Sequence, residues 1–133
     1  MLSAIFAGEL GVMHKKEFEM IFDTEDYEKQ LPLPATDKWK EGVWDIEAFK
    51  NGSMSLIYFA PEGADYQTPH DQDELYFVLE GNGEIEIEDV IHPFKKGSSI
   101  FVAAGQKHRF VGDLACIKMW AVFWGPKGGE KNA

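Results

Sequence analysis

Side chains that can bind a metal ion gather in two short stretches of this sequence, HDQDE at residues 70–74 and GQKHRF at residues 105–110. If the chain folds into one small barrel, both stretches can meet inside it. His70, Glu74 and His108 then supply two imidazoles and one carboxylate. Nitrogen and oxygen donors of this kind suit Fe(II), Mn(II), Ni(II), Cu(II) or Zn(II). The cluster therefore predicts a metal site, with an acid–base pair or a plain polar turn as the alternatives.

The spacing of His70, Gln72 and Glu74 sets a condition on the backbone. Residues four positions apart on an extended strand are separated by roughly 13 Å, so His70 and Glu74 cannot both reach one ion from a straight strand. A turn must lie between them, and the residues DQD at positions 71–73 are typical of turns. The next strand is expected to begin near Glu74, which places Tyr76 on the same face.

The rest of the chain shows the alternation expected of short antiparallel strands. No segment of residues 52–133 has a good helical period, and the alternation is clearest in GEIEIED at residues 83–89. Many short strands separated by glycine and proline turns predict an all-β protein, a sandwich or a barrel. The expected strands are residues 53–60, 74–81, 83–89, 98–105, 107–112 and 114–124, with a turn at residues 91–97 that contains His92.

Three parts of the chain are expected. Residues 1–50 form an N-terminal arm of loops, one helical turn and short strands that pack on the barrel, residues 51–125 form the barrel, and residues 126–133 form a flexible tail. The segment ELYFVLE at residues 74–80 is apolar on both faces, whereas a small barrel normally leaves one face of each strand in water. The outside must then be covered by the arm or by a second subunit, and we expect a homodimer.

The charge of the chain argues against some classes of partner, and its single cysteine indicates the redox compartment. The formal net charge is -10 and the pI is about 4.8, so nucleic acid and anionic membranes are not expected to bind. No apolar run reaches the ~20 residues of a membrane span. The single cysteine, Cys116, cannot form an internal disulfide, fits a cytoplasmic protein, and lies in an apolar run that predicts a packed position. Translation is hypothesised to begin at Met13, which would make residues 1–12 an extension.

Two motifs in this chain resemble those of the cupin superfamily. Glu74 is followed by LYFVLE and then Gly81, as at the end of the first cupin motif. Gly97 is followed by SSIFV, Ala103, one residue, Gly105, two residues and His108, as in the second motif. In that motif Ala103 stands where proline is usual, and Gly112 stands where asparagine is usual. The resemblance covers about half of the chain and implies an antiparallel jelly-roll barrel, also called a double-stranded β-helix.

The resemblance also implies a metal site, from which one of the usual three histidines is missing. Counted back from Glu74, His70 takes the position of the second histidine and Thr68 that of the first; counted forward, His70 is the first and Gln72 the second. The implied ligands are His70, Gln72, Glu74 and His108, with Thr68 as the alternative to Gln72. The implied ion is a divalent transition metal, Fe, Mn, Ni or Zn.

Three functions follow from this resemblance to small cupins of mostly unassigned activity. The first is a metal-dependent enzyme acting on a small molecule, most commonly a dioxygenase, with isomerase or lyase chemistry also open. Tyr76 or Glu74 would then serve as acid or base. The second is a module that binds a small molecule or a metal without turnover. The third is metal-free epimerase or isomerase chemistry, with His108 and Glu74 as a polar pair.

Overall fold

Within residues 19–131, the part of the chain that it describes, the computed structural model has eight strands and one short helix. The hypothesis about Met13 and the last two residues of the expected tail lie outside this range. In chain order the elements are α1 (Thr24–Glu28), β1 (Asp45–Asn51), β2 (Met54–Phe59), β3 (Asp73–Glu80), β4 (Gly83–Ile87), β5 (Val90–Phe94), β6 (Ser99–Val102), β7 (His108–Val111) and β8 (Lys118–Trp124).

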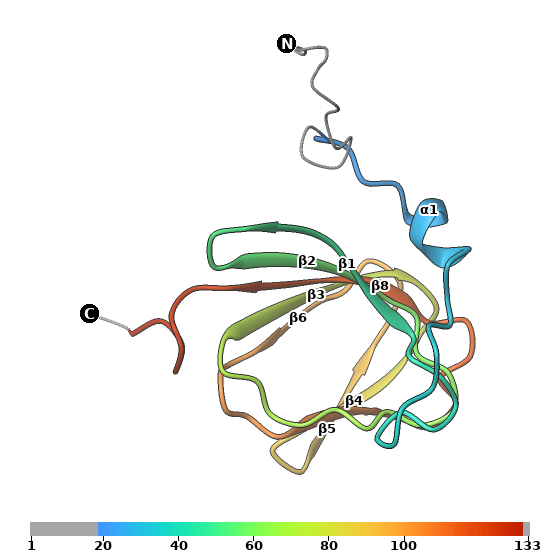
Figure 1. Cartoon of the computed structure of the whole chain (residues 1–133). Coiled ribbons are helices and arrows are strands. Elements are labelled where there is room, and N and C mark those ends of the chain that lie inside the picture. Colours follow the sequence, from blue (N-terminus) through green and yellow to red (C-terminus); the bar gives the residue numbers. More distant parts are fainter. Residues whose placement is uncertain (1–18, 132–133) are drawn as a thin grey trace, which may run out of the picture.

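The strands form two antiparallel sheets that face each other as a barrel (Figure 1). The larger sheet has the order β1-β2-β8-β3-β6, and the smaller has the order β5-β4-β7. Every strand pair is antiparallel, which confirms the expected all-β antiparallel fold. No helix among the described residues is long and apolar enough to cross a membrane.

Aromatic side chains join the two sheets across the barrel interior. The Phe110 ring on β7 lies 5.9 Å from Phe59 on β2, 5.1 Å from Tyr76 on β3 and 5.6 Å from Phe94 on β5, measured between ring centroids. On β8 the buried face carries Met119 and Ala121, because alternate side chains of a strand point to opposite faces. The core therefore fills one end of the barrel.

The prediction of a turn at residues 91–97 is partly wrong, because Val90–Phe94 forms strand β5. Glu88 and Asp89 both have positive φ, of 48° and 68°, and form the two-residue hairpin turn that joins β4 to β5. Pro93 is tolerated because β5 lies at the edge of its sheet, where a missing N–H costs no ladder hydrogen bond.

The expectation that Cys116 is packed in a strand is also wrong. β8 begins only at Lys118, and Cys116 is exposed in the preceding turn with a φ of 71°. Gly81, which has a φ of 84°, packs against this turn, and a Cβ atom there would lie 2.7 Å from the Cys116 carbonyl oxygen. The motif glycine is therefore required by close backbone contact between the end of β3 and the turn before β8.

The N-terminal arm covers part of the outer face of the larger sheet. The Tyr27 ring of α1 lies 5.9 Å from Trp120 on β8, and Glu28 accepts a hydrogen bond of 3.0 Å from the Tyr58 hydroxyl and pairs with Lys118. Farther along the same face, Phe101 on β6 remains 54% exposed. The sequence predicted that the arm or a second subunit would cover this face. The arm covers part of it and leaves the β3–β6 side open.

The beginning of the expected flexible tail is hydrogen-bonded to the barrel. The Gly128 N–H donates to the Asp71 carbonyl at 2.7 Å, and the Glu130 N–H donates to Asp73 Oδ2 at 2.9 Å. Asp73 Oδ1 also accepts from the Ala104 N–H at 2.9 Å. The division into arm, barrel and tail stays a prediction, but residues 128–130 are tied to the first residue of β3.

Candidate metal centre

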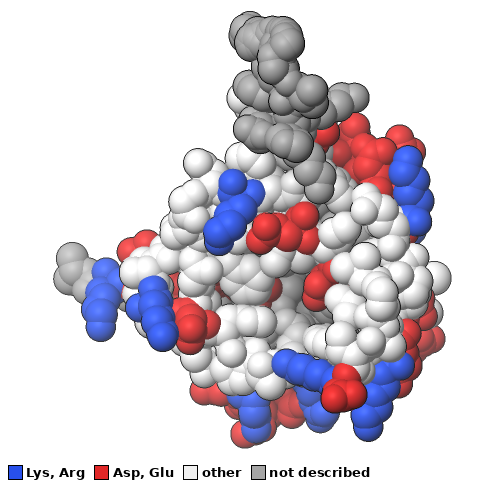
Figure 2. Space-filling view, viewed as in Figure 1, with Lys and Arg blue, Asp and Glu red and all other residues white. Residues whose placement is uncertain are grey.

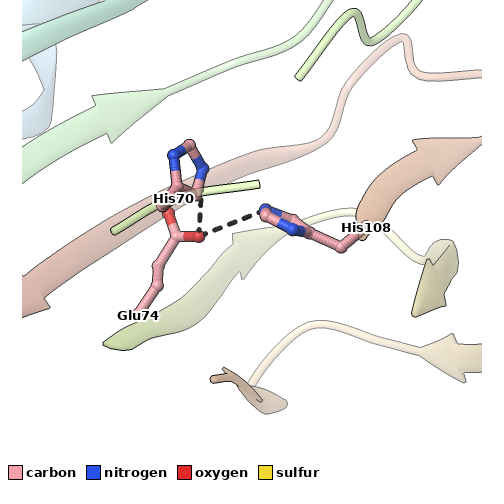
Figure 3. Close-up of side chains that lie close together, drawn as sticks. All are labelled: His70, Glu74 and His108. Carbon is pink, nitrogen blue, oxygen red and sulfur yellow. Dashed lines mark ion pairs between the residues drawn. The ribbon is translucent and has the colours of Figure 1, made fainter. Parts of the chain in front are cut away.

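His70, Glu74 and His108 come together at one end of the barrel interior (Figure 3). Glu74 lies on β3 of the larger sheet, His108 begins β7 of the smaller sheet, and His70 lies in the loop before β3. One donor atom from each residue lies within 4.8 Å of the other two. Glu74 Oε1 is 3.6 Å from His70 Nε2 and 3.4 Å from His108 Nε2.

The backbone bends between His70 and Glu74, as the sequence requires. Residues 71 and 72 form the bend, and β3 begins at Asp73. The His70 carbonyl accepts a hydrogen bond of 2.8 Å from the Gly105 N–H, in the turn that leads to β7. The second motif of the sequence therefore helps to position a residue of the first.

Two buried polar atoms of this cluster have no hydrogen-bond partner within residues 19–131. They are Glu74 Oε1 and His108 Nε2, and Glu74 as a whole is only 2% exposed. His108 Nδ1 lies 2.9 Å from the Gln106 carbonyl, which can only accept, so this nitrogen carries a proton and the neutral ring presents a lone pair at Nε2. A protein-held N–H on the far side of the ring is the usual arrangement for a metal-binding histidine. The residues present therefore fit a divalent metal ion.

The charges of the three residues depend on burial and on one another. Burial raises the pKa of Glu74 above its ordinary value, although contact with His108 opposes the rise. Burial lowers the pKa of His70 to about 4, helped by the nearby charges of His108 and Lys38, so His70 is neutral at pH 7. For His108, burial acts to lower the pKa, but Glu74 and the Gln106 carbonyl outweigh it and raise the pKa.

The structure does not bring the predicted ligand Gln72 into this group. Its side-chain amide donates to the Ser53 carbonyl at 2.7 Å and to the Gly125 carbonyl at 2.9 Å. Gln72 thus joins the β1–β2 turn to the residue after β8. Thr68, the alternative ligand, lies at the mouth of the adjoining cavity, where its Oγ1 accepts from Lys38 Nζ at 3.1 Å.

Gln67, which the motif comparison did not single out, does face the cluster. Its Oε1 lies 3.2 Å from His70 Nε2 and accepts a 3.0 Å hydrogen bond from the Tyr76 hydroxyl. Its Nε2 donates to Asp65 Oδ2 at 2.7 Å, which fixes the orientation of the amide. The sequence offered only one hint of this role for Gln67, the acidic residue Asp65 two positions earlier. Asp65 is buried and also accepts the Phe110 N–H at 2.8 Å.

Tyr76 lies in the barrel interior, on the same face as Glu74, as predicted from the strand alternation. Its side chain is only 1% exposed. Burial raises the pKa of Tyr76 well above its ordinary value, and the nearby Glu74 charge adds to the rise. The hydroxyl therefore keeps its proton at neutral pH and acts as a hydrogen-bond donor beside the cluster.

A cavity of about 330 Å³ opens from the cluster to the surface. His70, Glu74, Gln67 and Tyr76 line it as polar residues, and Ile57, Phe59, Ala121 and Phe123 line it as apolar ones. Figure 2 shows this face of the molecule hollowed, with both acidic and basic side chains near the hollow. The volume is that of a small-molecule site.

Comparison with known proteins places this architecture in a family. The sequence profile of the family described as "Cupin domain" matches residues 55–120. An uncharacterized protein of Streptomyces coelicolor is 32% identical over 78 residues, which is 59% of this chain and 74% of that protein. The acireductone dioxygenase of Leishmania major is 35% identical over 147 residues, 95% of this chain and 41% of that protein. The chain thus spans less than half of this second relative.

Solved structures agree on the fold. A cupin 2 conserved barrel domain protein from Salinispora arenicola superposes with a TM-score of 0.53 at 19% identity, over 61% of this chain and 74% of that chain. At this identity the likeness concerns the fold alone. The family profile, the bacterial relative and the barrel agree with the two sequence motifs, and the chain belongs to the cupin family.

Proposed function

We propose that this cupin is a metal-dependent enzyme that acts on a small molecule, with dioxygenase chemistry as the reaction class. The observation that carries the proposal is the pair of buried, unpartnered atoms Glu74 Oε1 and His108 Nε2, which lie 3.4 Å apart beside a cavity that Glu74 lines. The similarity to an acireductone dioxygenase supports the reaction class.

His70, Glu74 and His108 would hold the ion, which would be Fe, Mn, Ni or Zn. When bound, such an ion supplies a Lewis acid and, for a redox-active metal, a site for oxygen chemistry. We assign the fourth position to the Gln67 carbonyl oxygen rather than to Gln72, because the Gln67 oxygen lies 3.2 Å from His70 Nε2, whereas the Gln72 amide is hydrogen-bonded to Ser53 and Gly125.

Tyr76 would act on the substrate side of the site. Its hydroxyl stays protonated, and by turning away from Gln67 Oε1 it can donate its one proton in a hydrogen bond to a substrate oxygen that enters the cavity. Glu74 is the other candidate acid or base, and it fits that role in a metal-free site, because burial raises its pKa whereas a bound ion would keep it deprotonated.

Metal analysis and oxygen uptake test this function together. Tag-free protein is purified from its own host, its metals are measured by plasma mass spectrometry, and oxygen uptake is followed with a panel of small organic substrates. We expect one equivalent of a single transition metal and substrate-dependent uptake that falls in Tyr76→Phe while the metal content is unchanged. Metal without turnover of any compound would instead favour a binding module.

A metal-free epimerase or isomerase is the second candidate. It is favoured by the short contact of 3.4 Å between His108 Nε2 and Glu74 Oε1, which can hold a proton between them without an ion. Protein that carries no stoichiometric metal, that gains nothing from added Fe(II), and that still exchanges a substrate proton with deuterated solvent would establish this alternative.

We also propose that two copies of the chain associate through the uncovered outer face. Phe101 and Trp124 lie 6.2 Å apart there, between ring centroids, and Phe77 beside them is 39% exposed. β6 is the edge strand of the larger sheet, so a second copy can extend the sheet and cover this face in one symmetric contact. Location in the cytoplasm stays a prediction.

A further inference from the structure

The mouth of the cavity is built in part by the N-terminal arm, which lies outside the segment that matches the family profile. Lys38, Trp39 and Asp45 line the cavity, and all three precede the matched residues 55–120. The arm is held in place near the mouth by contacts of Trp39 and its neighbours. The Trp39 ring meets the Tyr66 ring edge-on at 5.5 Å, and the Tyr66 hydroxyl donates to Glu41 Oε2 at 2.9 Å.

Lys38 places a positive charge at this mouth. Its Nζ donates to Thr68 Oγ1 at 3.1 Å and lies 5.9 Å from the centre of the Trp39 ring. Among the described residues that line the cavity, Lys38 is the one lysine or arginine. The protein has a formal net charge of -10, so most of its charged side chains are acidic. A lysine at the cavity therefore differs from the average charge of the protein and marks a specific feature of this site.

The wall between Lys38 and the cluster is largely apolar. Trp39, Ile57, Phe59 and Phe123 contribute aromatic and aliphatic surface to the cavity. An apolar part of a ligand gains free energy when it leaves water and packs against such a wall. A charged group, by contrast, loses hydration and needs a partner of opposite sign. The cavity thus offers one cationic end and an apolar middle.

We propose that the cavity takes a small organic acid, whose single carboxylate pairs with Lys38 and whose apolar or aromatic body lies against Trp39 and Phe123. The inference rests on the proposed function only in taking this cavity as the substrate site. A phosphate ester is disfavoured, because it carries up to two negative charges and Asp45 lines the same cavity as the single lysine.

Benzoate and its uncharged analogue benzamide test the inference as a matched pair of probes. Their binding to zinc-loaded protein is measured by titration calorimetry in the wild type, in Lys38→Met and in Lys40→Met. Lys40 is exposed on the same loop and does not line the cavity, so it controls for a change in overall charge. Phenyl phosphate serves as the third probe.

We expect Lys38→Met to weaken benzoate binding about tenfold, which corresponds to the loss of one charge-assisted hydrogen bond at a partly exposed site. Benzamide binding should be unchanged in that variant, and Lys40→Met should bind both probes as the wild type does. Equal benzoate affinity in the wild type and Lys38→Met would overturn the inference, as would no benzoate binding by the wild type. An equal loss of benzoate affinity in Lys40→Met would also overturn it. So would binding of phenyl phosphate that is tighter than that of benzoate.

Metal content separates the failure of this inference from the failure of the proposed function. If the protein holds no metal when supplied with zinc, but benzoate binding still depends on Lys38, the proposed function fails and the carboxylate site stands. If the metal is bound and benzoate binding ignores Lys38, the metal site stands and the inference about the substrate is wrong.

Discussion

His108 Nε2 and Glu74 Oε1 lie 3.4 Å apart in the barrel interior, and neither atom has a hydrogen-bond partner among the described residues. The two residues come from different sheets, so docking of the sheets creates the contact. A buried carboxylate and a buried imidazole that face each other need a shared proton or a cation between them.

His108→Ala should abolish stoichiometric metal binding, because it removes one of the two imidazole donors from the site. His92→Ala is the control, since His92 is exposed on edge strand β5. Both variants are purified in parallel and their metals measured by plasma mass spectrometry, with circular dichroism to show that each is folded. Retention of the wild-type metal content by folded His108→Ala would disprove the site.

Gln67 and Gln72 should respond differently to replacement by methionine, which keeps the length of the side chain but removes its amide. Gln67→Met should weaken metal binding about tenfold or more, as expected for loss of a group that contacts or orients a ligand. Gln72→Met should leave metal affinity unchanged and lower the free energy of unfolding by about 1 kcal/mol, because its hydrogen bonds to two carbonyls are lost.

Metal titrations and urea unfolding of the two glutamine variants give both quantities. The opposite pattern, with weaker metal binding only in Gln72→Met, would restore Gln72 as the fourth ligand. It would require the turn before β3 to adopt another conformation when the metal is bound.

Acid should loosen the arm from the barrel through Glu28. Its hydrogen bonds with Lys118 and then Tyr58 lower the pKa of Glu28 below 4.5. A carboxyl whose pKa is lowered in the folded state stabilises that state above the ordinary pKa, and this contribution disappears as the pH falls through the lowered value. Glu28→Gln should therefore melt at a lower temperature than the wild type at pH 7, with the difference shrinking once the pH falls below 4.5 and disappearing below the lowered pKa of Glu28.

Melting curves at several pH values test the role of Glu28, with Glu25→Gln as the control on the same helix, since Glu25 is exposed. A constant difference between Glu28→Gln and the wild type at every pH would show that the ion pair is not the cause.

Phe101→Lys should convert a dimer into monomers. The substitution places a charge on edge strand β6 in the middle of the uncovered apolar face, where a symmetric contact would bring two such charges together. Sedimentation velocity of the wild type and the variant measures the change, and Val90→Lys on the exposed part of β5 is the control. A wild-type protein that sediments as a monomer over the micromolar range would refute the dimer.

The sequence was informative where a regular pattern or a motif spacing carried the information. The alternation of GEIEIED predicted β4, and the need for a turn between His70 and Glu74 predicted the bend at residues 71 and 72. The meeting of both residues with His108 followed from a barrel in which the two motifs share one interior, and their donor atoms do lie close together.

What the sequence did not reveal depends on contacts between distant segments. Pro93 suggested a turn, but its strand lies at a sheet edge, which no local pattern shows. Gln67 faces the site because Asp65 holds its amide, and Asp65 in turn is placed by the Phe110 N–H of β7. Asp73, which the DQD stretch assigns to a turn, is instead the buried first residue of β3 and accepts two backbone N–H groups from separate loops.

The hydrogen bond from the Gly105 N–H to the His70 carbonyl means that the cluster forms only when distant segments of the chain have come together. The first histidine of the cluster is positioned by a turn that lies 35 residues further along the chain, and Glu74 and His108 belong to opposite sheets. A half-folded chain therefore has no complete site, so an ion that binds there binds only the native state. Metal saturation would raise the melting temperature, and a chelator would lower it, which makes thermal stability a measure of site occupancy that needs no substrate.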